Sequence, residues 1–482
     1  EIPETQTLDG WPSVMNTEAA QQFRFKEGTV GMVGAALGGG TSINDDLFIE
    51  ENRDYFESLF AGSSFDLDEL YASYKLIGDT LARPELQTGL GAAWYNALNS
   101  TGHGPMFGHS LRRESRGTWL PYTGFGYPDA SGTRKRHSSA FLIHLEGANP
   151  HLVVRTQHLA QRLEFQGKRA VGVWVQDRTD CLSPTTRCDA ATTLVSASQA
   201  IILTAGALAT PKLLMKSGIG PREELAKFSV PVIVDNPRVG GNFIDRQIMS
   251  FAVMLDNATT EIGVTAVASD EERGMFLEST AGGKIVSELA KATLALAPPR
   301  DRTPAMKVLM EEIFKSKEVD KIMDEAMQLV ALQQNQDSRG SVTMGDDMDM
   351  ANPPSASTGT FTAPADMERQ REALTTLLKL VNSTALNPLF RRKPASFPTS
   401  LPSFLECIVQ APGELMPTAI LLPCPPADIS PDGVDKWARD TIVSSYHYFG
   451  TAAVGSVLRS SDLGVMGTDS LHVLDSSLFQ KP

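Results

Sequence analysis

The residues of this chain that could do chemistry are of two kinds, a histidine and several glycine-rich turns. His447 lies in the segment Tyr446-His447-Tyr448-Phe449-Gly450-Thr451. Its imidazole could take or give a proton near neutral pH, because the ordinary pKa of histidine is about 6.5. A lone histidine more often has a structural role, so residue type alone assigns no reaction to His447.

The segment 206–221 predicts a turn and a helix that could form one wall of a cofactor site. Before it, residues 200–205 form a short apolar run that is typical of a buried parallel strand. We predict Thr210 as the N-cap and Pro211 as the first residue of the helix, which ends near Gly218. Ligands bind outside the carboxyl ends of such strands in open α/β sheets, although an ordinary strand–helix connection has the same pattern.

Two further segments carry glycine and asparagine in compact patterns. Residues 34–44 are Gly-Ala-Ala-Leu-Gly-Gly-Gly-Thr-Ser-Ile-Asn, and residues 237–245 are Pro-Arg-Val-Gly-Gly-Asn-Phe-Ile-Asp. Together with 206–221 and the His447 segment, they resemble four motifs of the glucose-methanol-choline (GMC) oxidoreductases, in the family's order. The chain departs from the family at Ala35, where Arg, Lys or Asn is usual, and at Arg246, where His is usual.

This resemblance implies an α/β fold with two domains. One is an FAD/NAD(P)-binding, doubly wound domain of the GMC type, and the other is an α+β substrate domain with an antiparallel sheet. The flavin-type domain, which is incomplete, would comprise residues 1–50, 150–248 and 440–482, and the substrate-type domain residues 51–149 and 249–439. A chain of 482 residues exceeds what one hydrophobic core usually holds, which agrees with this division.

The resemblance also implies the cofactor, the reaction and the site residues. The cofactor is FAD, the reaction is oxidation of the CH–OH group of an alcohol, and His447 is the acid/base. No metal site is implied. The cofactor bed would comprise Ala36, Gly40, Asn44, Asp45, Asp46 and Leu47 near the ring system, Tyr446 beside the histidine, Ala160 at adenine, and Asp475 and Ser476 near the pyrophosphate.

Two carboxylates in that bed depart from the family. Asp45 and Asp46 stand where small residues are usual, and they would raise the electrostatic cost of an anionic reduced flavin. A hydroxynitrile lyase is the nearest enzymatic alternative. Residues 445–448 and 465–473 look most like the plant mandelonitrile lyase branch of the family.

Two parts of the family's flavin site were not found in the sequence. They are the Gly-x-Gly-x-x-Gly unit that holds the pyrophosphate and the second His or Asn that follows the catalytic histidine. Charge-assisted hydrogen bonds contribute about 1.5–3 kcal/mol each, so we expect these 482 residues alone to bind FAD weakly. Three explanations remain open: an incompletely represented active flavoenzyme, a nucleotide-binding unit supplied by another polypeptide, and a cofactor-free scaffold or assembly subunit with a protein partner.

Composition limits the partners. The chain has 57 acidic and 43 basic residues, a net charge of -14, which argues against a nucleic-acid partner. The resemblance to the GMC family implies a small-molecule alcohol as the substrate if the protein is active. No apolar run approaches the roughly 20 residues that span a bilayer, and the first residues resemble no leader, so no compartment is assigned. Cys181 and Cys188 flank a turn-rich segment and could form a disulfide or stay as free thiols.

The remaining patterns predict the elements that must position these residues. Residues 1–33 are expected to be polar and irregular, and residues 301–334 to be helical. We predict strands at 152–156, 170–175 and 249–256, and an amphipathic helix at 365–383.

Overall fold

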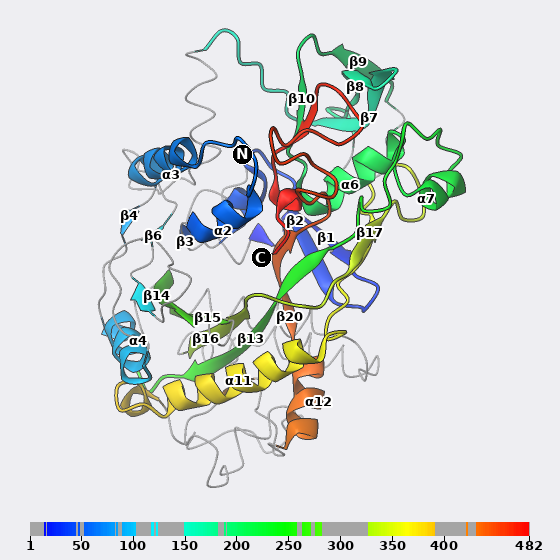
Figure 1. Ribbon diagram of the computed structural model, residues 1–482. Coiled ribbons are helices and arrows are strands. Elements are labelled where there is room, and N and C mark those ends of the chain that lie inside the picture. Colours follow the sequence, from blue (N-terminus) through cyan, green and yellow to red (C-terminus); the bar gives the residue numbers. More distant parts are fainter. Residues whose placement is uncertain are drawn as a thin grey trace.

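The structure is a computed structural model of the chain. It describes residues 14–15, 17–44, 47–48, 53–81, 83–84, 89–102, 117–119, 122–123, 149–181, 188, 190–257, 263–270, 275–281, 326–390, 421–422 and 430–481. Figure 1 shows the described elements in two groups, one around helix α6 and one around a long sheet with α11 beneath it, with strands β13 and β20 running between the groups.

The first group is built on a parallel strand pair. β10 (Ile201–Leu203) lies parallel to β21 (Leu471–Val473), and α6 (Gly206–Lys216) follows β10 directly. The alternate residues of both strands that face α6 are buried because the helix presents Leu213, Leu214 and Met215 to them. Around this core lie a second parallel pair, a helix and an antiparallel three-stranded sheet: β11 (Ile219–Gly220), β12 (Val234–Asp235), α7 (Arg222–Lys227), β7 (His158–Gln166), β8 (Arg169–Asp177) and β9 (Thr192–Ser196).

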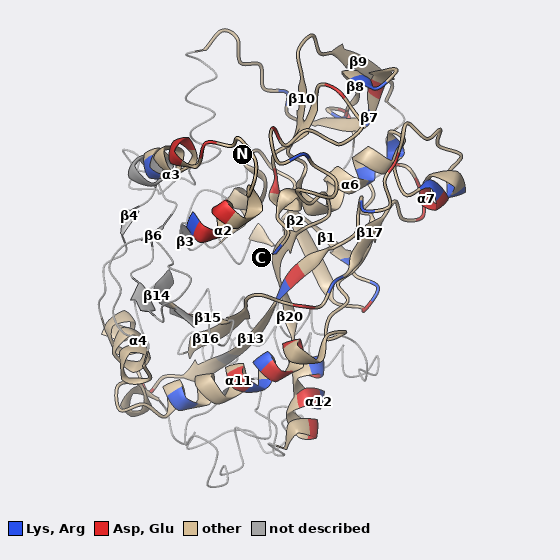
Figure 2. Ribbon diagram, viewed as in Figure 1, with Lys and Arg blue, Asp and Glu red and all other residues tan. Residues whose placement is uncertain are grey.

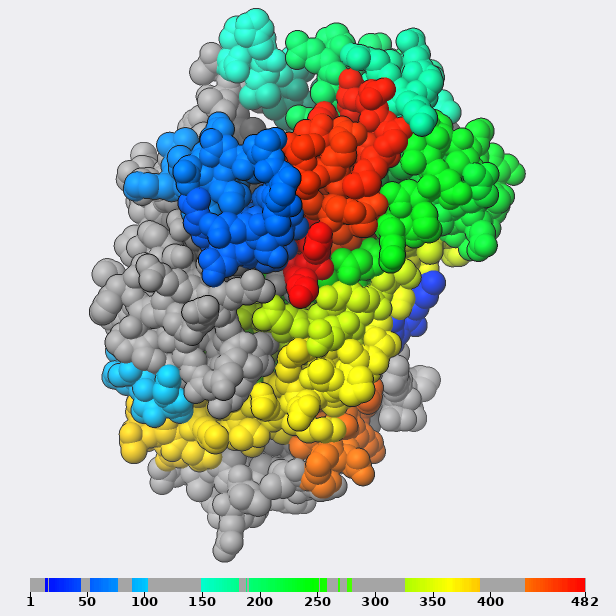
Figure 3. All heavy atoms as spheres, in the orientation of Figure 1, coloured from blue at the N-terminus to red at the C-terminus, as the bar shows by residue number. Residues whose placement is uncertain are grey.

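Two helices and the end of the chain pack beside this group. α2 (Arg53–Leu59) contributes Phe56 and Leu59 to the same hydrophobic cluster, and Tyr71 and Tyr74 of α3 (Leu67–Leu81) pack against it. The Tyr55 hydroxyl donates a hydrogen bond of 2.8 Å to the carbonyl of Lys481. Figure 3 shows the α2–α3 residues and the C-terminal residues side by side on one face of the molecule.

The second group is an antiparallel sheet covered by helices. Its path of neighbours is β19-β13-β16-β15-β14-β5, with β20 also paired to β13. α11 (Pro364–Val381) packs on β13 and β16, and α4 (Gly89–Ser100) packs on β14 and β15. The strands are β5 (Gly117–Trp119), β13 (Ile244–Met254), β14 (Gly263–Asp270), β15 (Met275–Ala281), β16 (Ala326–Gln333), β19 (Leu421–Leu422) and β20 (Val443–Phe449).

Shorter elements complete the described chain. They are β1 (Ala20–Arg24), β2 (Val30–Gly34), β3 (Leu47–Phe48), β4 (Arg83–Pro84), β6 (Tyr122–Thr123), β17 (Ser341–Thr343), β18 (Ser355–Ser357), α12 (Pro431–Thr441) and the 3₁₀ helices η2 (Gly39–Ser42), η3 (Asn387–Leu389) and η5 (Ser476–Leu478). Charged residues are frequent on the helices α3, α7, α11 and α12, as Figure 2 shows. None of the helices within these ranges is both long and apolar enough to cross a lipid bilayer.

The predicted mixture of helices and sheets, with an antiparallel sheet on the substrate side, is confirmed. The strand before Gly206, the strand near 249–256 and the helix near 365–383 are also present, as β10, β13 and α11. The proposed division into two domains at the stated residues stays a prediction.

Four local predictions were wrong. Part of the segment 1–33 forms the β1–β2 hairpin, in which Phe23 and Met32 are buried. Residues 326–333 form β16 instead of a helix, because every residue of this strand is buried between β13 and β15. The predicted strand at 152–156 begins instead at His158, after Gln157 takes a positive φ of 57°. α6 begins at Gly206, so Thr210 and Pro211 lie inside the helix instead of at its start.

Candidate functional site

The helix α6 starts against a carboxylate from the far end of the chain. Asp475 follows β21, and its Oδ2 accepts hydrogen bonds from the Gly206 N–H at 2.9 Å and from the Thr210 hydroxyl at 2.6 Å. A carboxylate at a helix N-terminus is stabilised by the free N–H groups there. Asp475 was predicted near a pyrophosphate. Its carboxylate accepts hydrogen bonds from α6 and from the Ser477 N–H, so it stabilises the start of α6.

Pro211 links α6 to the His447 segment. A proline inside a helix has no N–H for the carbonyl four residues earlier, which here belongs to Ala207. The Thr451 hydroxyl donates to that carbonyl at 2.6 Å and is fully buried. The proline of one motif is therefore tolerated because a threonine of another motif replaces the missing donor.

A bulge between β13 and β20 sets the direction of His447. Asp245 pairs with Tyr448 and Gln247 pairs with Ser444, so the single residue Arg246 lies opposite the three residues 445–447. Tyr446 has a positive φ of 62°, a conformation that costs a non-glycine residue energy. Such bulges re-aim side chains and are frequent beside active sites.

His447 has solvent contact although protein surrounds it. Its side chain is exposed, yet desolvation by the surrounding protein, followed by the positive charge of Arg246, lowers the pKa of His447 to about 3. Desolvation and the nearby guanidinium both disfavour the charged imidazolium, so His447 is neutral at physiological pH and can accept a proton.

The glycine segment 34–44 lies against the same strand. The Met32 N–H on β2 donates to the Tyr448 hydroxyl at 2.9 Å, and Ile43 packs in one cluster with Tyr446. A Cβ built on Gly39 or Gly40 would meet no atom within 4 Å, and the same is true of Gly206 at the start of α6. These backbones therefore border open space, as a bed for a flat ligand would require.

The structure brings some of the predicted site residues together and not others. Ala36, Gly40 and Asn44 lie in the segment 34–44, which is held near β20. Tyr446 lies in β20 itself, and the Ser476 carbonyl accepts the Gly450 N–H at 3.3 Å. Ala160 is apart, in β7, where it pairs with Val175. The backbone of Leu47 pairs with Thr123, whereas Asp45 and Asp46 lie outside the described residues.

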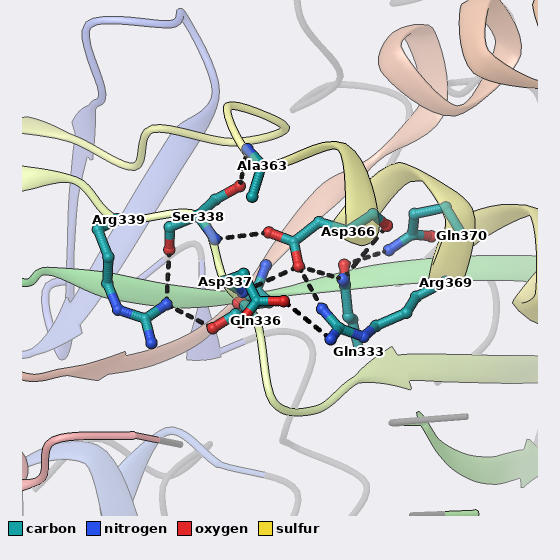
Figure 4. Close-up of polar contacts among 9 residues, drawn as sticks. All are labelled: Gln333, Gln336, Asp337, Ser338, Arg339, Ala363, Asp366, Arg369 and Gln370. Carbon is teal, nitrogen blue, oxygen red and sulfur yellow. Dashed lines mark hydrogen bonds and ion pairs between the residues drawn. The ribbon is translucent and has the colours of Figure 1, made fainter. Parts of the chain in front are cut away.

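A polar network fixes the 237–245 motif to the substrate-side sheet. The Asp366 carboxylate at the start of α11 accepts the N–H groups of Asp337 at 2.9 Å and Ser338 at 2.7 Å. Figure 4 shows this carboxylate pointing toward the loop that ends in Arg339. Arg339 Nε in turn donates to Asn242 Oδ1 at 2.9 Å, so the motif asparagine is held from the other group of elements.

Two features were missed or left open by sequence reasoning. Asp245 closes the 237–245 motif and is 3 % exposed, but nothing in its type indicated a buried carboxyl group. The choice between a disulfide and free thiols is settled by a Cys181–Cys188 disulfide, with a Cα–Cα distance of 5.8 Å.

Comparison with known proteins gives one family. Two family models described as GMC oxidoreductase match residues 20–248 and 336–482. The chain is 25% identical to sinalpyl alcohol oxidase Nec3 of Nesocodon mauritianus, over 97% of this chain and 75% of that protein. It is 26% identical to an (R)-mandelonitrile lyase-like protein of Arabidopsis thaliana, over 95% of this chain and 74% of that protein.

A solved structure shares the fold. Pyridoxine 4-oxidase from Mesorbium loti superposes with a TM-score of 0.72 at 17% identity, covering 100% of this chain and 88% of that one.

Proposed function

The chain belongs to the GMC oxidoreductase family, and from that premise we propose that it is an FAD-dependent oxidoreductase acting on the CH–OH group of an alcohol, with His447 as the acid/base. The observation that carries the proposal is His447 itself. This histidine is neutral, is exposed at a bulge, and follows Tyr446, which packs in one cluster with Ile43 of the segment 34–44. A relative named as an alcohol oxidase and a structural neighbour named as an oxidase support oxidation as the reaction class.

The described residues fit a flavin at the ring end of its site. The backbones at Gly40 and Gly206 leave space that a Cβ would otherwise enter, and the segment 34–44 is held next to the histidine strand. Ala36, Gly40, Asn44 and Tyr446 would hold the ring system there, together with Asp45, Asp46 and Leu47. Ser476 would face the phosphate side beside α6, and Ala160 would serve adenine through its backbone.

In this arrangement each residue has a separate task. FAD bound here would accept the hydride that leaves the alcohol carbon. His447 accepts the hydroxyl proton, which a neutral imidazole can do and an imidazolium cannot. Arg246, whose guanidinium lies 5.2 Å from the Phe449 ring centroid, supplies a positive charge that acts on His447.

A second candidate is a hydroxynitrile lyase-like flavoprotein. The similarity to mandelonitrile lyase-like proteins over nearly the whole chain favours it. The same histidine would then move a proton between the cyanohydrin oxygen and cyanide without any oxidation. The two reactions therefore differ in products and share the catalytic residue.

Product analysis of the purified chain supplied with FAD tests the proposal. The protein is incubated with a panel of primary and secondary alcohols and, separately, with a cyanohydrin, and carbonyl product, peroxide or reduced acceptor, and cyanide are measured. We expect carbonyl product from an alcohol, a loss of at least about 100-fold in His447→Gln, and no loss in the matched variant His158→Gln, whose histidine is exposed on β7.

Two results would contradict this proposal. Cyanide release without oxidation would identify the lyase. A protein that stays colourless with added FAD and copurifies with another polypeptide would identify a cofactor-free scaffold.

A further inference from the structure

A buried carboxyl group lies directly behind the bulge that carries His447. Asp245 is 3 % exposed on β13, opposite Tyr448, at the point where the register between β13 and β20 shifts. Neither carboxyl oxygen has a hydrogen-bond partner of normal geometry among the described residues. A buried carboxylate without donors is among the most costly groups in a protein interior, whereas a buried neutral acid is tolerated.

Among the residues that the structure describes, the groups that face Asp245 offer it no counter-charge. On β20 they are the phenols of Tyr446 and Tyr448, each with a pKa raised by burial and then by Asp245, and the hydroxyl of Ser444. Ser444 lowers the pKa of Asp245, but its hydroxyl makes no hydrogen bond of normal geometry to the carboxyl group; the hydroxyl oxygen accepts the Tyr446 N–H at 2.9 Å. From β2, the Met32 N–H donates to the Tyr448 hydroxyl.

Two described arginines on adjoining segments are directed elsewhere. Arg246 follows Asp245 on the strand, so its side chain leaves the opposite face, where it lies over Phe449. Arg339, on the loop that pairs with Phe243, donates to Asn242 Oδ1 and to the carbonyls of Gln336 and Ser338. Burial therefore dominates, and it raises the pKa of Asp245 to about 8.

We propose that Asp245 is a positioning residue that remains a neutral carboxylic acid beneath the bulge, and that its ionisation moves the 445–447 segment and changes the surroundings of His447. The geometry supports this because Asp245 borders the register shift that forms the bulge. Tyr446 is in a strained conformation, its N–H is bound by Ser444, and Ser444 lies beside the carboxyl group. A negative charge on Asp245 must find a donor, and the hydroxyls of Ser444, next to the bulge, and of Tyr446, within it, are donors that face the carboxyl group.

The role of His447 in this inference rests on the proposed function, but the protonation of Asp245 does not. A loss of activity would therefore say nothing about Asp245, and the test uses spectroscopy of the full chain without turnover. The variants are Asp245→Asn, which is isosteric and always neutral, and Asp256→Asn, which removes an exposed carboxylate just beyond the end of the same strand.

The first measurement is infrared spectroscopy of protein labelled with ¹³C at aspartate, at pH 6. We expect the carbonyl stretch of a protonated carboxylic acid, present in the wild type and in Asp256→Asn and absent in Asp245→Asn. The second is the NMR signal of the His447 ring, assigned with His447→Gln and followed as pH rises from 6 to 9. We expect a shift of that signal near pH 8 in the wild type that Asp245→Asn abolishes.

The absence of a protonated carboxyl band at pH 6 would overturn the proposal. A band that is present while the His447 signal moves alike in the wild type and in Asp245→Asn would overturn the positioning role. If both expected signals appear while no alcohol is oxidised, the proposed function fails and the inference about Asp245 stands.

Discussion

The replacement Asp245→Asn should change how the stability of the protein depends on pH. The pKa of Asp245 is raised from 3.8 to about 8 in the folded protein by desolvation. Between pH 4 and pH 8 the folded state therefore holds a proton that the unfolded state has released. The contribution of this group to the free energy of unfolding is fully present below about pH 4 and is lost as pH rises to about 8. Above about pH 8 the group no longer changes how the free energy of unfolding depends on pH.

The size of the effect follows from the same two values. A difference of about four pKa units corresponds to about 6 kcal/mol at about 1.4 kcal/mol per unit, and relaxation of the buried site makes this an upper bound. An amide has no proton to lose in this range. Relative to the wild type, Asp245→Asn should therefore gain up to about 6 kcal/mol in the free energy of unfolding between pH 4 and pH 8.

Urea unfolding at a series of pH values measures this difference. The midpoints of Asp256→Asn should follow those of the wild type, because the Asp256 side chain is exposed and loses no buried contact when the chain unfolds. The midpoints of Asp245→Asn should fall less steeply between pH 4 and pH 8. Parallel curves for the wild type and Asp245→Asn would refute the reasoning, because they would mean that Asp245 is ionised in the folded protein.

Three further substitutions test the contacts that hold the site, each by the midpoint of urea unfolding. Thr451→Val leaves the buried carbonyl of Ala207 without its donor and should cost about 1–3 kcal/mol; no loss would mean that another donor reaches that carbonyl. Asp366→Asn weakens several charge-assisted hydrogen bonds at the start of α11 and should cost about 2–3 kcal/mol, and an unchanged midpoint would refute its anchoring role. Gly450→Ala should cost about 3 kcal/mol or more, because φ is 93° and the new Cβ would lie 2.1 Å from a backbone oxygen. Gly62→Ala, at a φ of 74° with no atom within 4 Å, should cost only about 1–2 kcal/mol, and equal losses in the two glycine variants would contradict the contact at Gly450.

Much of the α6 region was predictable because its pattern is local. The short apolar run before Gly206 gave β10, and the amphipathic period near residue 370 gave α11. The start of α6 was not predictable in this way. Two residues more than 200 positions away complete its hydrogen bonds. Asp475 accepts the Gly206 N–H at the start of the helix, and Thr451 donates to the Ala207 carbonyl that Pro211 leaves without an N–H donor.

The prediction at residues 326–333 failed for a different reason. This run of β16 is buried on both faces, so it has no polar alternation to indicate a strand, and its Met and Leu residues also fit a helix. The same limit applies to Asp245. Its position could be read from the motif, but its neutrality depends on what the fold places around it.

The reaction of the protein is tested most directly by the flavin colour on mixing with an alcohol in the absence of oxygen. The full chain with FAD added in solution should show the visible absorbance of oxidised flavin and lose it when an alcohol substrate is added. The flavin absorbance in the presence of His447→Gln should be lost at least about 100-fold more slowly. If no alcohol bleaches the flavin, or if the flavin bleaches as fast with the variant as with the wild type, His447 is not the acid/base of a flavin-dependent alcohol oxidation.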